Sequence, residues 1–504
     1  MKKILSLLII ATINISGQSF VKEFPSGFST VFKNLSEVNS YYFGGNPAQL
    51  NFSIEDELLA LNSNNYYDEG SFKKVIDPKS TRNYVLSASG KKSITENQNF
   101  KGSFGFQRNE RVDWQWLFTR DYNSGNPFLL GDSTTGKSRI NGIVMNAEYS
   151  ARLTEDLNFG ANLFYGVDEA LKTVSPRPTA IHRDIKGRVG VNYSLFSNFS
   201  AGLFVEVADN NERISYREDE GAITQETIIM KFKGYDFPNI FRKKTETRYS
   251  YFNGYKSGLT FEYIPFRNSI LTGYFSAGYE KNNVKDDAIS PKSEGFWSDD
   301  VINGGVQYYQ IISNSFQIGL VYKLNKNSGW GKYSPYNVLY YDRENTSHEI
   351  ESGVSFQLLK QTYLGLELGL GATNISENDH YSSVTSKSSL LSYLGRVGFS
   401  HKINDVLSSV LSYAIKLNTI SEGNITEVSP GVYYTSFMKY DLLFEQTDYY
   451  AHTVALSASY SISNTDKILL YVNYNYLQPR NSVVFGNSSK SIVDVNLEYR
   501  LKVY

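Results

Sequence analysis

The five histidines are the first residues to test for chemistry, because imidazole serves both as a metal ligand and as a general base. No two of them stand at the spacing of a zinc motif, and no serine is marked out as a nucleophile. A hydrolase site of the Ser-His-Asp kind stays open as a third alternative, but the sequence predicts no enzyme and no cofactor. We expect His380 and His452 to be solvent-exposed loop residues near the outer rim of the fold. The histidines are His182, His348, His380, His401 and His452.

Acidic side chains gather in polar stretches of the chain, where carboxylates could chelate calcium. None of these clusters has the spacing of an EF-hand loop with its central glycine. We therefore interpret them as solvated loop charge and predict no metal site. The clusters are Glu218-Asp219-Glu220, Asp286-Asp287 and Asp299-Asp300.

A third set of charged side chains alternates with apolar residues along short segments. On the lipid face of a membrane barrel such charges cost about 2 to 4 kcal/mol each at the midplane, so a lumen is their expected place. Their mixed signs predict either a water-filled passage or an internal ion-pair network. The candidate lumen-facing residues are Glu206, Lys323, Glu367, Arg396, Lys416, Asp494, Glu498, Arg500 and Lys502.

Short strands are the elements that must position these side chains. In residues 363–372, four leucines point one way while the glycines and Glu367 point the other, which is the period of two of a strand with unlike faces. The same alternation recurs in residues 157–165, 199–207, 316–324 and 454–460. A soluble sandwich with one wet face would alternate in the same way.

The connections between the strands favour a barrel over a sandwich. Very short links such as 197–198 and 360–361 take turns with long polar stretches such as 168–183, 209–253 and 325–347. Tight turns at one end and long loops at the other are typical of outer-membrane barrels. We therefore predict an all-β fold: an antiparallel transmembrane β-barrel of about 18 strands, within about 14 to 20, with short periplasmic turns and long extracellular loops.

The composition agrees with an aromatic-rich β protein. Tyr and Phe, 39 and 31 residues, favour strands, and Tyr also suits a water-to-lipid boundary. The net charge of -1 provides no field that would recruit nucleic acid. The chain contains no cysteine, which excludes disulfides and thiolate metal sites.

The N-terminal residues are typical of a secretion signal. Met1-Lys2-Lys3 is followed by an apolar stretch and by small residues, which predicts a signal peptide over 1–19. Residues 20–78 do not alternate cleanly, and we expect a lumenal plug, a periplasmic segment or one further hairpin there, ahead of a barrel over 79–504. Gly44-Gly45-Asn46-Pro47 has turn chemistry and is the candidate plug turn.

The step Asn46-Pro47-Ala48 resembles the start of the long-chain fatty-acid outer-membrane transporter family, whose relatives include a shuttle subunit of gliding-type secretion systems. In that family the segment enters or plugs the barrel, so the resemblance implies a plug here. The predicted strand number exceeds the number usual in that family. The Tyr- and Asn-rich style of the whole chain also resembles uncharacterised outer-membrane barrels of Bacteroidetes-type bacteria, a resemblance that transfers no site residues.

The C-terminal residues 491–504 alternate apolar with polar side chains and end on an aromatic. This pattern resembles the signal read by the barrel-assembly machinery and implies that machinery as a partner during biogenesis. Tyr504 departs from the pattern, because it falls out of phase with the apolar face.

Passage of a small or amphipathic solute, passive or gated, is the predicted function, and the alternative is a barrel scaffold for secretion or surface-protein assembly. A barrel of about 18 strands has a lumen too wide for side chains alone to fill. Water, a loop, the N-terminal segment or a ligand must then occupy it. The expected partners are outer-membrane lipid and a solute, without nucleic acid, and the predicted location is the bacterial outer membrane.

Overall fold

The computed structural model describes residues 27–33, 38–53, 58–217, 227–235, 238–243, 245–404, 406–428, 431, 433–463 and 466–502. The predicted signal peptide, the acidic cluster Glu218-Asp219-Glu220 and Tyr504 lie outside these ranges. Within them, no helix combines the length and the apolar character that crossing a membrane requires.

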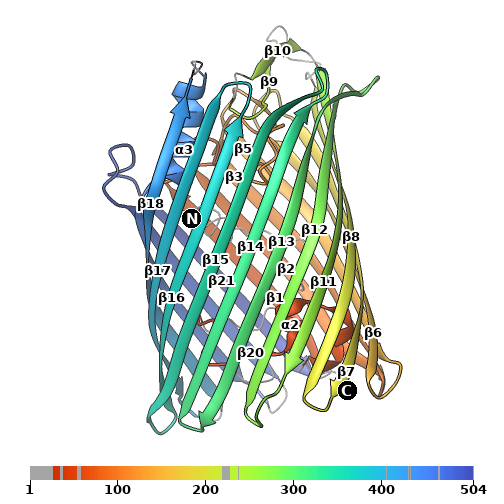
Figure 1. Ribbon diagram of the computed structural model, residues 1–504, viewed down its shortest axis with the longest axis vertical. Helices are drawn as coiled ribbons and strands as arrows, with labels where there is room; N and C mark the ends of the chain where they lie inside the picture. Colours follow the sequence, from red (N-terminus) through yellow and green to blue (C-terminus); the bar gives the residue numbers. More distant parts are fainter. Residues whose placement is uncertain are drawn as a thin grey trace.

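Strands make up most of the described chain, and its helical segments are short (Figure 1). In chain order the elements are α2 (Ser40–Gly44), η2 (Pro47–Phe52), β1 (Leu58–Gly70), β2 (Ser80–Thr95), β3 (Gln98–Trp114), β4 (Leu130–Asp132), β5 (Gly136–Arg152), β6 (Leu157–Lys172), β7 (Thr179–Phe196), β8 (Phe199–Arg217), β9 (Thr227–Lys231), β10 (Asn239–Lys243), β11 (Thr245–Tyr263), β12 (Ser269–Asp286), β13 (Lys292–Ser313), β14 (Phe316–Tyr333), β15 (Val338–Leu359), β16 (Thr362–Asp379), β17 (Val384–Lys402), β18 (Leu407–Glu427), η3 (Tyr434–Met438), α3 (Lys439–Glu445), β19 (Tyr449–Ser461), β20 (Lys467–Pro479) and β21 (Lys490–Lys502).

One antiparallel sheet of 18 strands closes into a barrel (Figure 1). Each barrel strand pairs with the next barrel strand in the chain, and β21 returns to pair with β1, with Leu59 opposite Leu501. The remaining strands, β4, β9 and β10, form a small separate sheet near the end of the barrel that carries the longer connections. The predicted antiparallel transmembrane β-barrel of about 18 strands is confirmed.

The barrel begins earlier than the predicted boundary at residue 79. β1 pairs with β2 on one side and with β21 on the other, so it is a full member of the wall. The alternation is weak here because Ser63 and Asn65, at the outward positions that follow Leu59 and Leu61, are polar. Of the 18 barrel strands, 17 lie within residues 79–504, where the barrel was predicted, and β1 is the eighteenth.

Several stretches predicted as long loops are strand. β6 runs to Lys172 and β7 begins at Thr179, so most of the stretch 168–183 is paired. The stretch 325–347 shrinks to a connection at 334–337 between β14 and β15. The sequence pattern did not reveal these strand ends, because their outward residues, such as Asn374, are polar. Without apolar outward residues, the hydrophobic pattern shows no period of two.

An apolar band surrounds the outer wall next to the short turns. On β16, for example, Leu366, Leu368 and Leu370 are 41%, 69% and 57% exposed. Exposed aromatics border the band on both sides, with Phe399 and Tyr460 near the short turns and Tyr84 and Trp330 farther along the strands. An outward apolar band between aromatic girdles is the surface that a barrel presents to lipid.

The substitution Leu368→Arg tests this band. An arginine near the bilayer midplane is expected to lower the free energy of unfolding in lipid by about 2 to 4 kcal/mol. The measurement is urea titration in liposomes, followed by the heat-dependent gel mobility of the folded barrel. The matched control is Asn374→Arg on the same face of β16, beyond the band, which should have less than half the effect. Equal losses for both variants would contradict the placement of the band.

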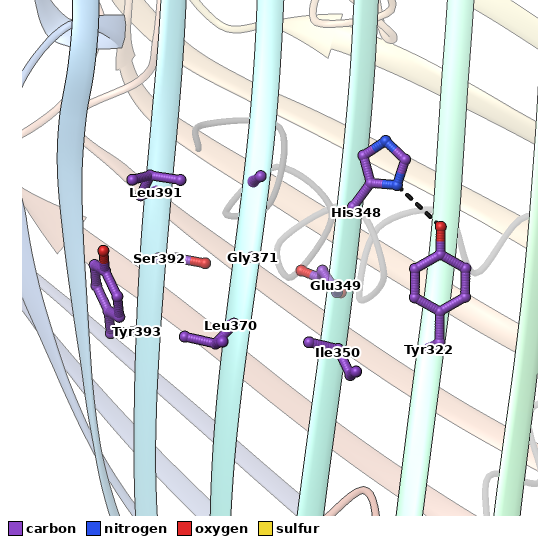
Figure 2. Close-up of a pocket in the computed structure, with 10 residues that line it drawn as sticks. Tyr322, His348, Glu349, Ile350, Leu370, Gly371, Leu391, Ser392 and Tyr393 are labelled. Carbon is purple, nitrogen blue, oxygen red and sulfur yellow. Dashed lines mark hydrogen bonds between the residues drawn. The ribbon is translucent and has the colours of Figure 1, made fainter.

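A shallow groove crosses this outer wall at β14–β17 (Figure 2). Its apolar walls are the outward side chains of Tyr322, Ile350, Leu370 and Tyr393. At one edge, the hydroxyl of Tyr322 hydrogen bonds Nδ1 of His348 over 3.0 Å. The groove lies within the lipid-facing band and is separate from the lumen.

Candidate functional site

The N-terminal segment, described at residues 27–33 and 38–53 and called the strap below, lies against the inner wall near the short turns. The strap meets the barrel strands in reverse chain order. Gly27 packs against β18 and β19, Thr30 against β14 and β15, and Val38 against β12 and β13. The 3-10 helix η2 then contacts β5, β6 and β7, and Ser53 reaches β2. The strap therefore passes around most of the inner circumference before the chain enters the wall as β1.

Glu367 holds the first part of the strap. Its carboxylate accepts hydrogen bonds from the backbone N–H of Ser29 at 3.0 Å and of Thr30 at 3.2 Å, and from Oγ1 of Thr30 at 2.9 Å. Arg396 on the neighbouring strand β17 forms an ion pair with the same carboxylate. Because the side chain of Glu367 is fully buried, these partners offset the free-energy cost of burying its charge.

Glu262 and Glu148 hold the short helix α2. The carboxylate of Glu262 accepts hydrogen bonds from the backbone N–H and the hydroxyl of Ser40, both at 2.9 Å. The hydroxyl of Tyr41 donates to Glu148 over 3.0 Å. The side chain of Asn39 caps the N-terminus of this helix, and Gly45 follows its C-terminus in a left-handed conformation with φ of 66°.

Asn46 anchors the turn that was the candidate plug turn. Its Nδ2 donates to the carbonyls of Val191 at 3.1 Å and Leu203 at 3.3 Å, and its Oδ1 accepts from the N–H of Ala48 at 3.1 Å. This approach to the wall requires a glycine at position 190, where a Cβ would lie 2.1 Å from Oδ1 of Asn46. Gly44 packs against Thr260 and Tyr274, the carbonyl of Gly45 accepts from Arg188, and Pro47 begins η2.

At the opposite end, a second layer fills the lumen, and we call it the cap. It consists of residues 115–135 with β4, residues 227–235 with β9, and residues 433–448 with η3 and α3. Its apolar side chains pack on inward side chains of β5–β8 in one buried cluster, and α3 packs on inward side chains of β16–β20 in another. The first cluster contains Trp114, Leu117, Phe118, Leu130, Ile140, Ala170, Ala180, Ile214, Tyr216, Ile229, Met230, Phe232 and Tyr433.

Arg120 is the most highly connected cation of the cap. Its guanidinium reaches Asp168 over 2.9 Å and Asp184 over 3.0 Å, and its backbone N–H donates to Glu212 over 2.9 Å. His182 lies among the same carboxylates, with Nε2 at 2.7 Å from Glu212. Three inward carboxylates on β6, β7 and β8 thus surround one arginine that the cap supplies.

Two buried cations of the wall also bind the cap around the mouth. Lys172 of β6 forms an ion pair with Asp132 of the cap over 2.7 Å, and Arg248 of β11 donates a hydrogen bond to the backbone carbonyl of Leu129 over 2.9 Å. Each contact joins a cap residue to an inward side chain of the wall, so polar contacts hold the cap as well as apolar packing.

Lys74 joins the connection between β1 and β2 to α3. Its Nζ lies 2.7 Å from Glu445, and the backbone N–H of Val75 donates to Asp441 over 2.7 Å. Burial alone would lower the pKa of Lys74, but the carboxylates of Glu445 and Asp441 outweigh burial and raise that pKa above its ordinary value. The ammonium therefore stays charged and keeps α3 tied down.

The inner wall between the strap and the cap is polar, and we call it the middle band. On β15, Gly353, which contacts the strap, lies ten positions from Arg343, which packs against Gly125 of the cap; this is about 33 Å along the strand. Inward side chains of the band keep part of their surface accessible, because Lys323 on β14 and Glu349 on β15 are both only half-buried. Side chains therefore do not fill this part of the lumen.

The predicted lumen-facing residues all lie on the inward face. Glu367 and Arg396 pair with each other, Glu206 pairs with Arg188, and Glu498 pairs with Arg500. Lys323 and Lys416 face inward on β14 and β18, on the same alternation as Gly319 and Ser412, which contact the strap.

Sequence reasoning missed other site residues. His452 is not a loop residue, because it lies on the outward face of β19, where Nδ1 is 2.8 Å from the Tyr413 hydroxyl. No local sequence pattern around His182 indicates its contacts with Asp168 and Glu212. The acidic pair at Asp286 is not solvated loop charge, because Asp286 forms a buried ion pair with Arg248. No sequence signal marks Arg120, which lies in a polar stretch.

A family model described as a family of unknown function, DUF6850, matches residues 47–501. No curated protein matches the sequence. The solved structures with a similar course of the chain include a deltaS2 mutant of the monoaromatic hydrocarbon channel TodX, with 10% identity, coverage of 92% of this chain and 95% of that chain, and a TM-score of 0.32.

Two further solved structures are similar to the same degree. The toluene transporter TbuX of Ralstonia pickettii has 11% identity, coverage of 98% and 100%, and a TM-score of 0.33. The copper transporter OprC has 9% identity, coverage of 88% and 80%, and a TM-score of 0.44. Similarity of this size carries no argument about a solute.

Proposed function

The chain belongs to the DUF6850 family of unknown function, and from that premise we propose that it mediates gated passage of a small solute across the bacterial outer membrane. The middle band is the observation that carries the proposal. A polar wall with partly exposed side chains lies inside a closed barrel whose outer face is apolar. Such a wall stabilises water and polar solutes in the lumen. No covalent chemistry is needed for this function.

In this proposal the strap and the cap are the two gates. The strap, which contains the Asn46-Pro47-Ala48 step, lies at the periplasmic end as a plug, and the cap closes the extracellular end. The signal peptide over 1–19 delivers the chain to the periplasm, and the C-terminal strand guides insertion by the barrel-assembly machinery. The resemblance to Bacteroidetes-type barrels stays a prediction.

The inward charges of the wall, in the middle band and beside the strap, predict weak ion selectivity. On the wall of β14–β18, Lys323, Arg396 and Lys416 stand beside Glu349, Glu351 and Glu367, so the signs balance. We expect purified protein in planar bilayers to conduct salt, with a cation-to-anion permeability ratio within about twofold of one. The measurement is the reversal potential across a salt gradient. Protein that conducts no ions, even when its gates are weakened, would contradict the proposal.

A further inference from the structure

Positively charged side chains gather on the outer wall at β2, β3 and β5, just beyond the apolar band. Each lies at an outward position of its strand, on the same alternation as the exposed apolar residues nearer the short turns. Arg82 and Arg139 are exposed, and the side chains of Arg108 and Lys137 are 41% and 33% exposed. All four cations are therefore accessible from outside the barrel.

One carboxylate, that of Glu110 on β3, lies among these cations. Arg108 and Lys137 each approach it to 2.6 Å, and Arg139 lies 3.4 Å away. Arg82 of β2 is directly opposite Glu110 in the register of the sheet. A single carboxylate balances one of the four cations, so the group keeps a positive charge. We call Arg82, Arg108, Glu110, Lys137 and Arg139 the basic patch.

Two further outward carboxylates flank the basic patch, Glu69 on β1 and Glu169 on β6. Among the described residues, neither forms an ion pair with a cation of the patch, and Glu69 instead accepts a hydrogen bond from the hydroxyl of Tyr67. Even when both are counted, positive charges outnumber negative ones on this part of the wall.

Outward cations on two other parts of the wall each face one carboxylate. Lys326 of β14 pairs with Glu344 of β15 over 2.8 Å, and Arg183 of β7 lies 3.7 Å from Asp209 of β8. On the described outer face, Glu110 is the only carboxylate that forms ion pairs with three cations. The excess of positive charge is thus a property of this place and not of the outer wall in general.

The basic patch lies at the level where lipid headgroups meet the barrel. Tyr84 belongs to the exposed aromatics that border the apolar band, and Arg82 is the next outward residue of β2, about 7 Å farther from the short turns. Nearer the short turns, Leu86 and Phe106 are 59% and 43% exposed. Aromatic girdles mark the boundary between hydrocarbon and headgroups. A lipid whose acyl chain covers these two side chains therefore brings its headgroup to Arg82 and Arg108.

The side chains of the patch suit a phosphate group. A guanidinium binds phosphate through paired N–H donors, and an ammonium adds a point charge. The guanidinium carbon of Arg82 lies 5.0 Å from the ring centroid of Tyr67, which positions the side chain without neutralising its charge. Arg139 is the cation farthest from Glu110 among its three ion-pair partners, so it can turn to a phosphate while Arg108 and Lys137 stay on the carboxylate.

We propose that the basic patch binds the phosphate group of an anionic lipid in the outer leaflet, with the acyl chains of that lipid against the apolar band. Charge complementarity and continuity with the lipid-facing surface carry the inference together. It goes beyond the proposed function, because it concerns the outer wall and holds whether or not a solute passes through the lumen.

The test is native mass spectrometry of the full-length protein in a neutral detergent with added phosphatidic acid. Phosphatidylcholine with the same acyl chains is the matched probe, because its choline group neutralises the charge of the phosphate. Each cation near an anionic lipid contributes about fivefold to affinity, so phosphatidic acid should bind at least about tenfold more tightly than phosphatidylcholine. The double variant Arg82→Gln with Arg139→Gln should weaken binding of phosphatidic acid about twentyfold.

The double variant leaves Arg108 and Lys137 on Glu110, so the ion pairs of the wall persist. The matched control is Arg183→Gln with Lys326→Gln, which removes two cations from other parts of the outer face and should change the affinity less than about twofold. Heat-dependent gel mobility shows whether each variant is folded. Arg139→Gln alone, a single exposed change, should weaken binding about fivefold and decides the matter if the double variant does not fold.

Equal affinity for the two lipids, or equal affinity of the wild type and the folded variants for phosphatidic acid, would overturn the inference. Glycerol phosphate, which carries the phosphate but no acyl chains, should not displace the bound lipid. Full displacement by glycerol phosphate would instead identify a site for soluble anions and would reject the lipid as the partner of the patch.

Discussion

Replacing Glu367 with alanine is expected to release residues 29 and 30 of the strap and to increase the ion conductance of the barrel. The variant removes the acceptor of the Ser29 and Thr30 hydrogen bonds and leaves Arg396 without its buried partner. Breaking a buried pair of this kind costs about 3 to 5 kcal/mol. A loss of about 3 kcal/mol shifts the docking equilibrium of the strap about a hundredfold toward the released state.

Because the chain has no cysteine, a single introduced thiol reports the release directly. Val31 is fully buried beside Thr30, so Val31→Cys should react slowly with a maleimide in the otherwise native protein. Adding Glu367→Ala should accelerate labelling about a hundredfold, and conductance should rise with it. Glu367→Gln, which keeps one acceptor oxygen, should have a smaller effect.

The matched control is Glu344→Ala on β15. Glu344 also forms an ion pair, with Lys326 over 2.8 Å, but its side chain is 53% exposed, and exposed pairs contribute about 0 to 1 kcal/mol. Labelling of Val31→Cys should not change in that background. If Glu367→Ala leaves both labelling and conductance at the native level, the strap is not held by this carboxylate and is not the gate at that end.

Replacing Arg120 with alanine is expected to loosen the cap and to destabilise the barrel by about 3 to 5 kcal/mol. The variant removes the guanidinium that Asp168 and Asp184 share, while His182 stays in contact with Asp168 and Glu212. Buried carboxylates that lie close together repel one another when the cation between them is removed. We expect faster proteolysis of residues 115–135, a lower temperature for loss of the folded gel band, and longer open times in bilayer recordings.

A second substitution separates charge repulsion from lost packing. In the Arg120→Ala background, Asp184→Asn removes one of the crowded charges and should restore part of the stability. Arg183→Ala is the control, because Arg183 on β7 lies 3.7 Å from Asp209 with both side chains about half exposed. A cap that stays protease-resistant in Arg120→Ala would show that apolar packing alone holds it.

The alternation of strands such as β16 made the barrel and its inward charges predictable from sequence. Four leucines opposite Glu367 already imply that the carboxylate faces inward, because the period of two is a local property. The sequence did not predict that strands such as β15 extend so far toward the long connections. The outward faces of these extensions lie beyond the apolar band and carry polar residues. Tertiary hydrogen bonding extends these strands where the hydrophobic pattern ends.

The partners of the inward charges were beyond sequence reasoning. Ser29 and Glu367 are 338 residues apart, and no local pattern links a serine near the N-terminus to a carboxylate on β16. Arg120 is a similar case, because its three carboxylate partners come from three different strands. Such contacts depend on barrel register and on the path of a segment through the lumen, both of which emerge only once the wall has closed.

The position of the strap also dictates an order of assembly. The strap leads directly into β1, and the pairing of β1 with β21 seals the wall around it. Its partners, from Glu367 on β16 to Glu262 on β11, belong to strands synthesised long after it, and contacts of such separation form late. We therefore expect the strap to enter while the seam between β1 and β21 is still open, so that closure of the barrel encloses it.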